Sequence, residues 1–98
     1  MTKATILAHI KAANTNKDIK WYVAEKTDNK IVLTNSYDTC VMFTIAFEDD
    51  CIIVTDEHMG HAVDYLYKGE SRWDDYKNDD DGVMLAIKSA VRYFNNVY

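Results

Sequence analysis

Four short segments that alternate apolar and polar side chains follow one another closely in the middle of the chain. They cover residues 19–26, 30–36, 40–47 and 51–56. Only three residues separate each segment from the next. A parallel crossover needs about a dozen residues or more, so connections this short predict neighbouring strands that run antiparallel. The middle of the chain is therefore predicted to be a four-stranded antiparallel meander.

The third of these segments is apolar on both sides of the predicted strand. Phe43 and Ile45 fall on one face. Met42 and Ala46 fall on the other face. A strand with one solvated face normally carries polar residues on that face. We therefore expect residues 40–47 to form a central strand that is covered on both sides.

Helical periodicity marks the two ends of the chain. Thr2 is a suitable N-cap for a first helix that runs to about Ala13, with Ile6 and Ile10 on one face. A last helix is predicted from Gly82 to about residue 97, because apolar residues recur there at helical spacing. Three aspartates precede this last helix, where they would suit its positive N-terminus.

A further helix is predicted directly after the fourth strand. Met59, Val63 and Leu66 are spaced by four and three residues, which favours a helix over residues 57–68. Gly69 would end this helix in a left-handed conformation. Residues 71–74 match a capping box and are predicted to begin a short helical turn.

These elements predict an α+β fold for residues 1–98, which are long enough for a single domain. The predicted order is an N-terminal helix, a four-stranded antiparallel meander and two or three C-terminal helices packed on the sheet. Whether the helices share one face of the sheet is left open by the sequence. No apolar run approaches the roughly 18–20 residues of a membrane span, and no export signal is recognisable.

The formal net charge of -5 is distributed very unevenly. Residues 48–81 contain twelve acidic residues against three basic ones, whereas the segments on either side are both mildly basic. Such local asymmetry steers partners more than the total charge does. The acidic stretch is either a solvated surface that keeps the protein soluble or a binding surface, and the charge pattern alone leaves both interpretations open.

Two candidate metal sites fail on their spacing. On a helix, Glu57, His61 and Asp64 would share a face, but the metalloprotease order H-E-x-x-H is absent around His58. A calcium loop over the aspartates before Gly82 would place lysines at its first and last ligand positions. We therefore expect neither a metal nor a cofactor.

Catalytic signatures are absent as well. Cys40 and Cys51 lie in apolar strands, where a thiol usually packs as a small hydrophobic group. The chain contains only three glycines and no nucleophile elbow, so neither a phosphate loop nor an oxyanion loop is recognisable. A disulfide between the two cysteines is not expected, because a hairpin turning at residues 49–50 separates them. The sequence predicts that the protein is not an enzyme and that its location is cytoplasmic.

The most distinctive stretch is residues 64–81, which mixes acidic and aromatic side chains. Tyrosine and tryptophan are frequent at binding hot spots, and carboxylates can occupy the basic sites that normally hold nucleic-acid phosphates. We therefore predict a partner-binding surface here, directed at a protein with a basic nucleic-acid-binding groove and not at nucleic acid itself. Its predicted residues are Asp64, Glu70, Trp73, Asp74, Asp75, Tyr76, Asp79, Asp80 and Asp81.

In size, charge and lack of catalytic motifs, the chain resembles the small acidic proteins that phages use against host defence, such as anti-CRISPR and anti-restriction proteins. This resemblance implies an inhibitor that mimics DNA and works in the host cytoplasm. An immunity or antitoxin protein that neutralises a partner toxin is the alternative. A small metal- or ligand-binding domain around His58 and His61 is a weaker alternative. The target, the source and the oligomeric state are not determined by the sequence.

Overall fold

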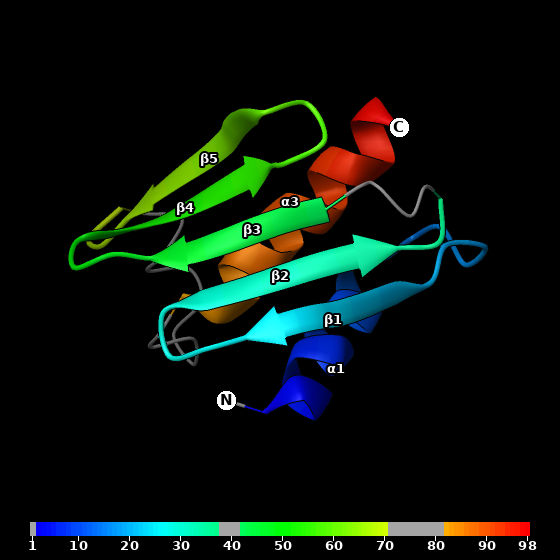
Figure 1. Ribbon diagram of the computed structural model, residues 1–98, viewed down its shortest axis with the longest axis horizontal. Coiled ribbons are helices and arrows are strands. Elements are labelled where there is room, and N and C mark those ends of the chain that lie inside the picture. Colours follow the sequence, from blue (N-terminus) through cyan, green and yellow to red (C-terminus); the bar gives the residue numbers. More distant parts are fainter. Residues whose placement is uncertain (1, 38–41, 71–81) are drawn as a thin grey trace.

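Five antiparallel strands form one sheet in the order of the sequence, and α1 and α3 lie behind it in Figure 1. The computed structural model describes residues 2–37, 42–70 and 82–98. The described elements are α1 (Lys3–Ala13), β1 (Trp21–Lys26), β2 (Lys30–Asn35), β3 (Met42–Phe47), β4 (Cys51–Asp56), β5 (His61–Tyr67) and α3 (Val83–Val97). The α+β class and the antiparallel meander are confirmed, but the sheet has five strands where four were predicted.

The first helix begins and ends where its sequence predicts. The Thr2 hydroxyl accepts a hydrogen bond from the Thr5 N–H over 3.2 Å, which satisfies one of the free donors of the first turn. Ile6 and Ile10 are buried one helical turn apart and face the sheet. None of the helices in the described ranges is both long enough and apolar enough to cross a membrane.

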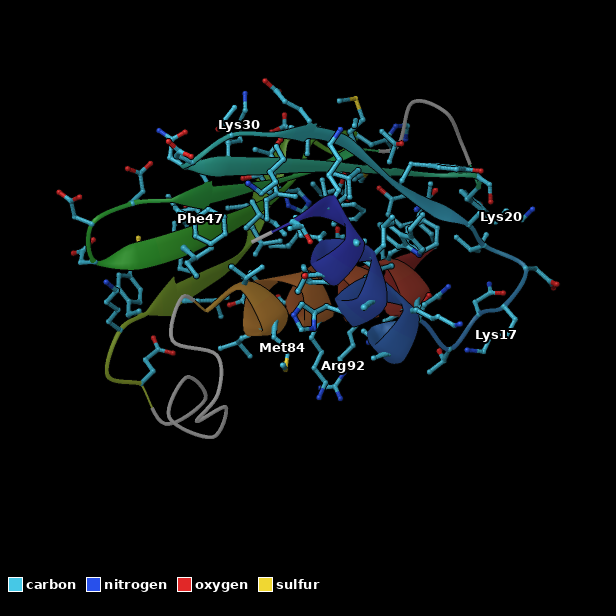
Figure 2. The ribbon with its side chains drawn as sticks, turned by 90° about the horizontal axis from the view of Figure 1, so that it is seen from below. Lys17, Lys20, Lys30, Phe47, Met84 and Arg92 are labelled. Carbon is cyan, nitrogen blue, oxygen red and sulfur yellow. The ribbon has the colours of Figure 1, made fainter. Side chains whose placement is uncertain are left out.

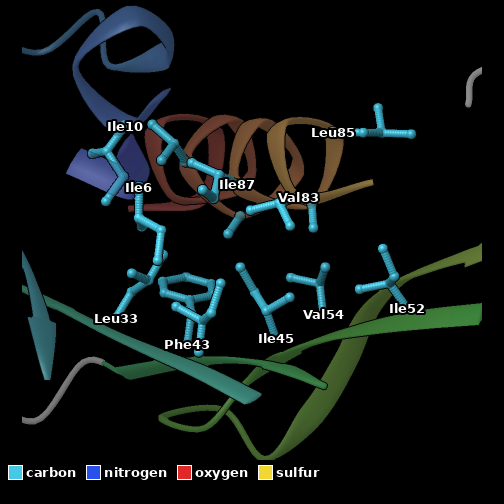
Figure 3. Close-up of a cluster of buried hydrophobic side chains, with 14 of the residues drawn as sticks. Ile6, Ile10, Leu33, Phe43, Ile45, Ile52, Val54, Val83, Leu85 and Ile87 are labelled. Atoms are coloured by element: carbon cyan, nitrogen blue, oxygen red, sulfur yellow. The ribbon is translucent and has the colours of Figure 1, made fainter. Parts of the chain in front are cut away.

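The hydrophobic core lies between the two helices and one face of the sheet, which we call the inner face. Figure 3 shows Leu33, Phe43, Ile45 and Val54 pointing from the strands toward Ile87 of α3. Inward and outward residues alternate along β3 and β4, as expected for strands with one packed face. Figure 2 shows the same arrangement from another side, with the helices stacked against the sheet as a second layer.

The helix predicted over residues 57–68 is wrong, because these residues form a turn followed by β5. Asp56 Oδ1 accepts hydrogen bonds from the N–H groups of His58 and Met59, at 3.0 and 3.1 Å. The Gly60 N–H donates to the Asp56 carbonyl over 2.8 Å. These bonds cap a single helical turn, as an N-cap side chain does, but the turn is not continued. Gly60, with a φ of 77°, then directs the chain into β5.

A β-bulge explains why β5 has apolar residues at helical spacing. The register with β4 shifts between Val54 and Thr55, which leaves Val63 without a partner in the ladder. Beyond the bulge, Leu66 is buried whereas Tyr65 is exposed. The extra residue interrupts the strict two-residue alternation, so the sequence pattern imitates a helix. Gly69 does take the predicted left-handed conformation, with a φ of 87°, but it follows a strand.

The described helices cover only one face of the sheet. β3 is the central strand, as predicted, but no described element lies on its outer side, where Met42, Thr44 and Ala46 are half-buried. The prediction that this strand is covered on both faces is therefore not met by the described residues. The helical turn predicted at residues 71–74, and Cys40 with its expected lack of a disulfide, lie outside the described residues.

Replacing leucine by alanine at a buried and at an exposed position compares how much the core and the surface contribute to stability. Leu33→Ala removes a side chain with no exposed surface, and we expect it to lower the free energy of unfolding by about 3 kcal/mol, because a cavity remains. Leu7→Ala removes a leucine that is 42% exposed, and the expected loss is below about 1 kcal/mol. Urea denaturation of both variants measures the difference. Equal losses would contradict the arrangement of the core.

Candidate functional site

Four carboxylates gather around the β3–β4 turn and the end of β5, and we call this region the acidic end. It consists of Glu48, Asp49 and Asp50 in the β3–β4 turn and Glu70 after β5. The Lys68 N–H donates to the Asp50 carbonyl over 3.2 Å, so the turn and the end of β5 lie side by side (Figure 1). The fold therefore brings together two acidic segments that are about twenty residues apart in the sequence.

The geometry of this end follows from its hairpin. The Glu48 N–H donates to the Cys51 carbonyl over 2.9 Å, which closes the β3–β4 turn across Asp49 and Asp50. Short acidic side chains are well suited to such turns and remain in solvent there. Glu48, Asp49 and Asp50 are all exposed, whereas Glu70 is half-buried.

Cys51 lies in the negative electrostatic field of the carboxylates at the acidic end. Burial raises the pKa of the Cys51 thiol, and the neighbouring Asp50 and Glu48 carboxylates raise it further. A thiol held in its protonated form is a weak nucleophile, because the thiolate is the reactive species. Cys51, the described cysteine, is also buried. The arrangement around it therefore favours packing over covalent chemistry.

Two tyrosines border the acidic end on the outer face of β5. Tyr67 pairs with Cys51 and Tyr65 pairs with Ile53 in the β4–β5 ladder. The exposed fractions of Tyr65 and Tyr67 are 49% and 46%. Half-exposed aromatic side chains beside charged groups are typical of binding surfaces, since they bury a large area with few rotatable bonds. These tyrosines belong to the acidic and aromatic stretch 64–81 that the sequence singled out, although they were not among the predicted site residues.

The predicted partner-binding residues are only partly described. Glu70 lies at the acidic end. Asp64 lies on the inner side of β5, where its Oδ2 accepts a hydrogen bond of 2.7 Å from the Ser89 hydroxyl and so ties β5 to α3. Outside the described residues lie Trp73, Asp74, Asp75, Tyr76, Asp79, Asp80 and Asp81. In the sequence these seven residues lie three to eleven positions after Glu70.

A second polar cluster lies at the other end of β4, around the carboxylate of Asp56. This side chain has no exposed surface. The Tyr98 hydroxyl donates to its Oδ2 over 2.7 Å, while the N–H groups of His58 and Met59 donate to its Oδ1. Tyr98 also stacks on Phe94, with ring centroids 5.0 Å apart. Asp56 thus holds the β4–β5 turn and the end of α3 in one place.

The hydrogen bonds keep the buried carboxylate ionised. Burial alone would raise the pKa of Asp56, but the donors from Tyr98, Met59, Tyr93 and His58 together outweigh it and leave the pKa below its usual value. Burial and the Asp56 charge raise the pKa of Tyr93 in turn. A carboxylate that already accepts several hydrogen bonds is a poor general base. The cluster therefore acts as a structural anchor.

The histidines do not form the arrangement that would hold a metal. Glu57, His61 and Asp64 would share a face only on a helix, and residues 57–64 instead form a turn and a strand. The rings of His58 and His61 lie edge-on to Tyr98 and Tyr93, with centroids 6.1 and 6.5 Å apart. Within the described ranges, no group of three or more possible ligand side chains is found.

The sequence contained a signal for the Asp56 anchor that periodicity obscured. An aspartate followed four residues later by a glycine is typical of a turn in which the side chain captures backbone N–H groups. The involvement of Tyr93 and Tyr98 had no such signal, because only the packing of α3 brings them to the end of β4.

The two helices carry charge of the opposite sign from the acidic end. Neither α1 nor α3 contains an aspartate or a glutamate. Their charged residues are Lys3, Lys11, Lys88 and Arg92. Figure 2 shows Arg92 on the side of the helix layer away from the sheet. Among the described residues, the charged side chains of the two helices are therefore all basic, whereas most carboxylates lie on or beside β3, β4 and β5.

Comparison with protein-family models, with curated proteins and with solved structures found no match.

Removing the Tyr98 hydroxyl tests the anchor. We expect Tyr98→Phe to lower the free energy of unfolding at pH 7 by about 2 kcal/mol, because a hydrogen bond to a buried carboxylate is lost. Urea denaturation measures this loss. Tyr22→Phe, at a half-exposed tyrosine on β1, is the matched control and should change stability little.

The loss of stability in Tyr98→Phe should also depend on pH. The pKa of Asp56 is lowered by folding, so its stabilisation is complete above the unfolded value of about 4 and is lost as the pH falls through the lower folded value. The difference between wild type and Tyr98→Phe should therefore be largest at neutral pH and shrink as the pH falls below about 4. An unchanged difference across that range would show that the carboxylate charge is irrelevant.

Proposed function

We propose that this protein is a non-enzymatic binding protein that presents its acidic end to a basic surface on another protein. The observation that carries the proposal is the meeting of Glu48, Asp49, Asp50 and Glu70 around the β3–β4 turn and the end of β5, bordered by two half-exposed tyrosines. Basic grooves that hold nucleic-acid phosphates are the surfaces that such carboxylates fit best. The partner is therefore a nucleic-acid-handling enzyme, and the effect of binding is inhibition.

The distribution of charge supports this direction of binding. The helix layer has no acidic residue, so the protein is not uniformly acidic and has one preferred orientation in an electric field. Such a charge distribution accelerates association with a positively charged groove and turns the acidic end toward it. Close to the partner, Tyr65 and Tyr67 supply the apolar area that charges alone do not provide.

The residues that follow Glu70 in the sequence are also rich in acidic and aromatic side chains. Residues 71–81 carry five aspartates together with Trp73 and Tyr76. In the proposal this stretch contributes to the same surface, because it follows Glu70 closely in the sequence. Its aspartates compete for the lysine and arginine side chains that normally contact phosphates.

A host-defence complex is the proposed target, in agreement with the resemblance to small acidic phage inhibitors, and the cytoplasm is the proposed place of action. An immunity or antitoxin role would use the same acidic surface against a toxin. Identification of the captured protein distinguishes the two, because a nuclease complex and a toxin encoded beside the gene are different proteins.

Neutralising the acidic end tests the proposal. Glu48→Gln/Asp49→Asn/Asp50→Asn should weaken binding to the partner by about tenfold or more, because long-range attraction and contacts with basic side chains are both lost. Tagged protein is used to capture partners from its native host, and these are eluted in a salt gradient and identified by mass spectrometry. The wild-type complex should elute at a higher salt concentration than the complex of the variant.

A pair of double variants with the same change in charge provides the control. Asp18→Asn/Glu57→Gln removes two exposed carboxylates that lie away from the acidic end, and it is compared with Asp49→Asn/Asp50→Asn, which removes two carboxylates at that end. The former should elute like wild type. If both double variants eluted at the same salt concentration, net charge and not the acidic end would be responsible, and the proposed surface would be wrong.

The aspartates after Glu70 are tested separately. We expect neutralisation of these side chains to abolish inhibition of the captured enzyme, and circular dichroism establishes that the variant is folded. The substitutions are Asp74→Asn, Asp75→Asn, Asp79→Asn, Asp80→Asn and Asp81→Asn. Enzyme activity on a nucleic-acid substrate measures inhibition, and retention of full inhibition would refute mimicry of phosphates.

A further inference from the structure

A pocket opens on the surface between α1 and the start of β1, and we call it the α1–β1 pocket. Its volume is about 380 Å³, which lies within the range of about 300–1,000 Å³ that is usual for small-molecule sites. Apolar side chains make up most of its wall, and they are Leu7, Ile10, Ile19 and Trp21. Because Leu7 is 42% exposed, this apolar surface can be reached from solvent. An apolar wall of this kind can hold the body of a small organic ligand.

The charged side chains that line the α1–β1 pocket are all basic. They are Lys11, Lys17 and Lys20. In the part of the chain that the structure describes, none of these lysines forms an ion pair with a carboxylate. Figure 2 shows Lys17 and Lys20 on the connection that leads from α1 to β1. A cleft that has apolar walls and charge of one sign concentrates the electric field, so this pocket attracts anions.

Hydrogen bonds hold the connection between α1 and β1 in place. The Asn14 Nδ2 group donates to the Ile19 carbonyl over 3.1 Å. Lys17 Nζ donates to the Asn14 carbonyl over 3.4 Å, which keeps this ammonium group beside the pocket. The Lys20 N–H donates to the Ser36 hydroxyl over 2.9 Å. The wall is therefore formed before a ligand arrives, which lowers the entropic cost of binding.

Trp21 adds a hydrogen-bond donor that has no acceptor. Trp21 lines the pocket and is 7% exposed, and its Nε1 has no hydrogen-bond partner among the described residues. An indole N–H can only donate, and a buried donor without an acceptor is uncommon because it costs free energy. Anionic oxygens are the strongest acceptors that a ligand can offer to such a group. This donor, independently of the lysines, therefore indicates a ligand with acceptor oxygens.

The pocket is far from the acidic end, so the carboxylates there do not oppose the binding of an anion. β1 and β3 start at the same end of the sheet, whereas the β3–β4 turn lies at the opposite end (Figure 1). A strand of six residues, such as β3, is about 20 Å long. This length is more than twice the Debye length of about 8 Å at physiological ionic strength. Asp18 belongs to the connection between α1 and β1 but does not line the pocket, so the lysines remain in excess.

From these observations we infer that the α1–β1 pocket binds a small organic anion with an apolar body, such as a medium-chain carboxylate. The apolar body packs on Leu7, Ile10 and Ile19. The anionic group accepts hydrogen bonds from the lysine ammonium groups and from the indole N–H of Trp21. A membrane surface does not fit, because Leu7 and Tyr22 are the only large apolar side chains of this pocket that are exposed. Binding here needs neither the acidic end nor a protein partner, so this site is separate from the surface of the proposed function.

Titration of ¹⁵N-labelled protein with octanoate, followed by NMR, tests this site directly. Trp73→Phe leaves Trp21 as the only tryptophan, so its indole N–H gives a single peak. We expect octanoate to move this peak along a saturable curve, with a Kd of about 1 mM or below for a ligand of this size. Octylammonium, which has the same apolar chain and the opposite charge, should bind at least about tenfold more weakly, because lysines repel it.

Two further probes separate the contributions of chain and charge. Octanol lacks the negative charge and acetate lacks the apolar chain, so each should bind at least about tenfold more weakly than octanoate. The absence of a saturable shift with octanoate would overturn the assignment of this site. An equal affinity for octylammonium or octanol would do the same, because the lysines would then select nothing.

A pair of double variants locates the anion. Lys11→Gln/Lys20→Gln removes two positive charges from the pocket and should weaken octanoate binding by about tenfold. Lys68→Gln/Arg92→Gln makes the same change in net charge at exposed positions that do not line the pocket, and it should bind octanoate like wild type. Equal weakening in both variants would show that net charge, and not this pocket, attracts the ligand.

Leu7→Ala tests the apolar wall without a change in charge. Because Leu7 is largely outside the core, the variant should stay folded, which circular dichroism and urea denaturation establish, and it should bind octanoate about threefold more weakly. If folded Leu7→Ala and folded Lys11→Gln/Lys20→Gln both bound octanoate like wild type, the ligand would lie elsewhere. Octanoate binding is measured without any protein partner, so its failure leaves the proposed binding at the acidic end untouched.

Discussion

The structure depends on the burial of one stripe of α3 against the inner face of the sheet. Burying one valine, isoleucine or phenylalanine side chain stabilises a fold by about 1.5–3 kcal/mol relative to exposure. The stripe comprises Val83, Ala86, Ile87, Ala90, Val91 and Phe94. Its position also fixes the polar contacts, because it brings Ser89 to Asp64 and Tyr98 to Asp56. The same packing leaves the outer face of the sheet without a described cover.

Much of the fold could be predicted from local patterns, and the exception has a definite cause. The first four strands, their antiparallel order and the two terminal helices follow from alternation, short turns and helical periodicity. The fifth strand was predicted as a helix, because a bulge at Val63 hides its alternation. The chain makes one turn capped by Asp56, and Gly60 then leaves the helical conformation with a φ of 77° and leads into β5.

For the candidate site as well, the sequence shows part of the arrangement and the tertiary structure decides the rest. That residues 48–81 are acidic is evident from the sequence, and so is the presence of aromatic residues among them. Which of these side chains share a surface depends on pairings between distant strands. Asp50 lies beside Lys68 because β4 pairs with β5, and Asp64 turns inward to Ser89 because α3 covers that side. Neither contact has a local signature.

The sequence by itself determined the α+β class, the antiparallel meander and the uneven distribution of charge, because these properties depend on neighbouring residues and short connections. Only the tertiary structure decided that both described helices share one face and that the acidic turn meets the end of β5 beside Tyr65 and Tyr67. These features arise from the burial of apolar surface between distant segments, which depends on the whole chain and not on local periodicity.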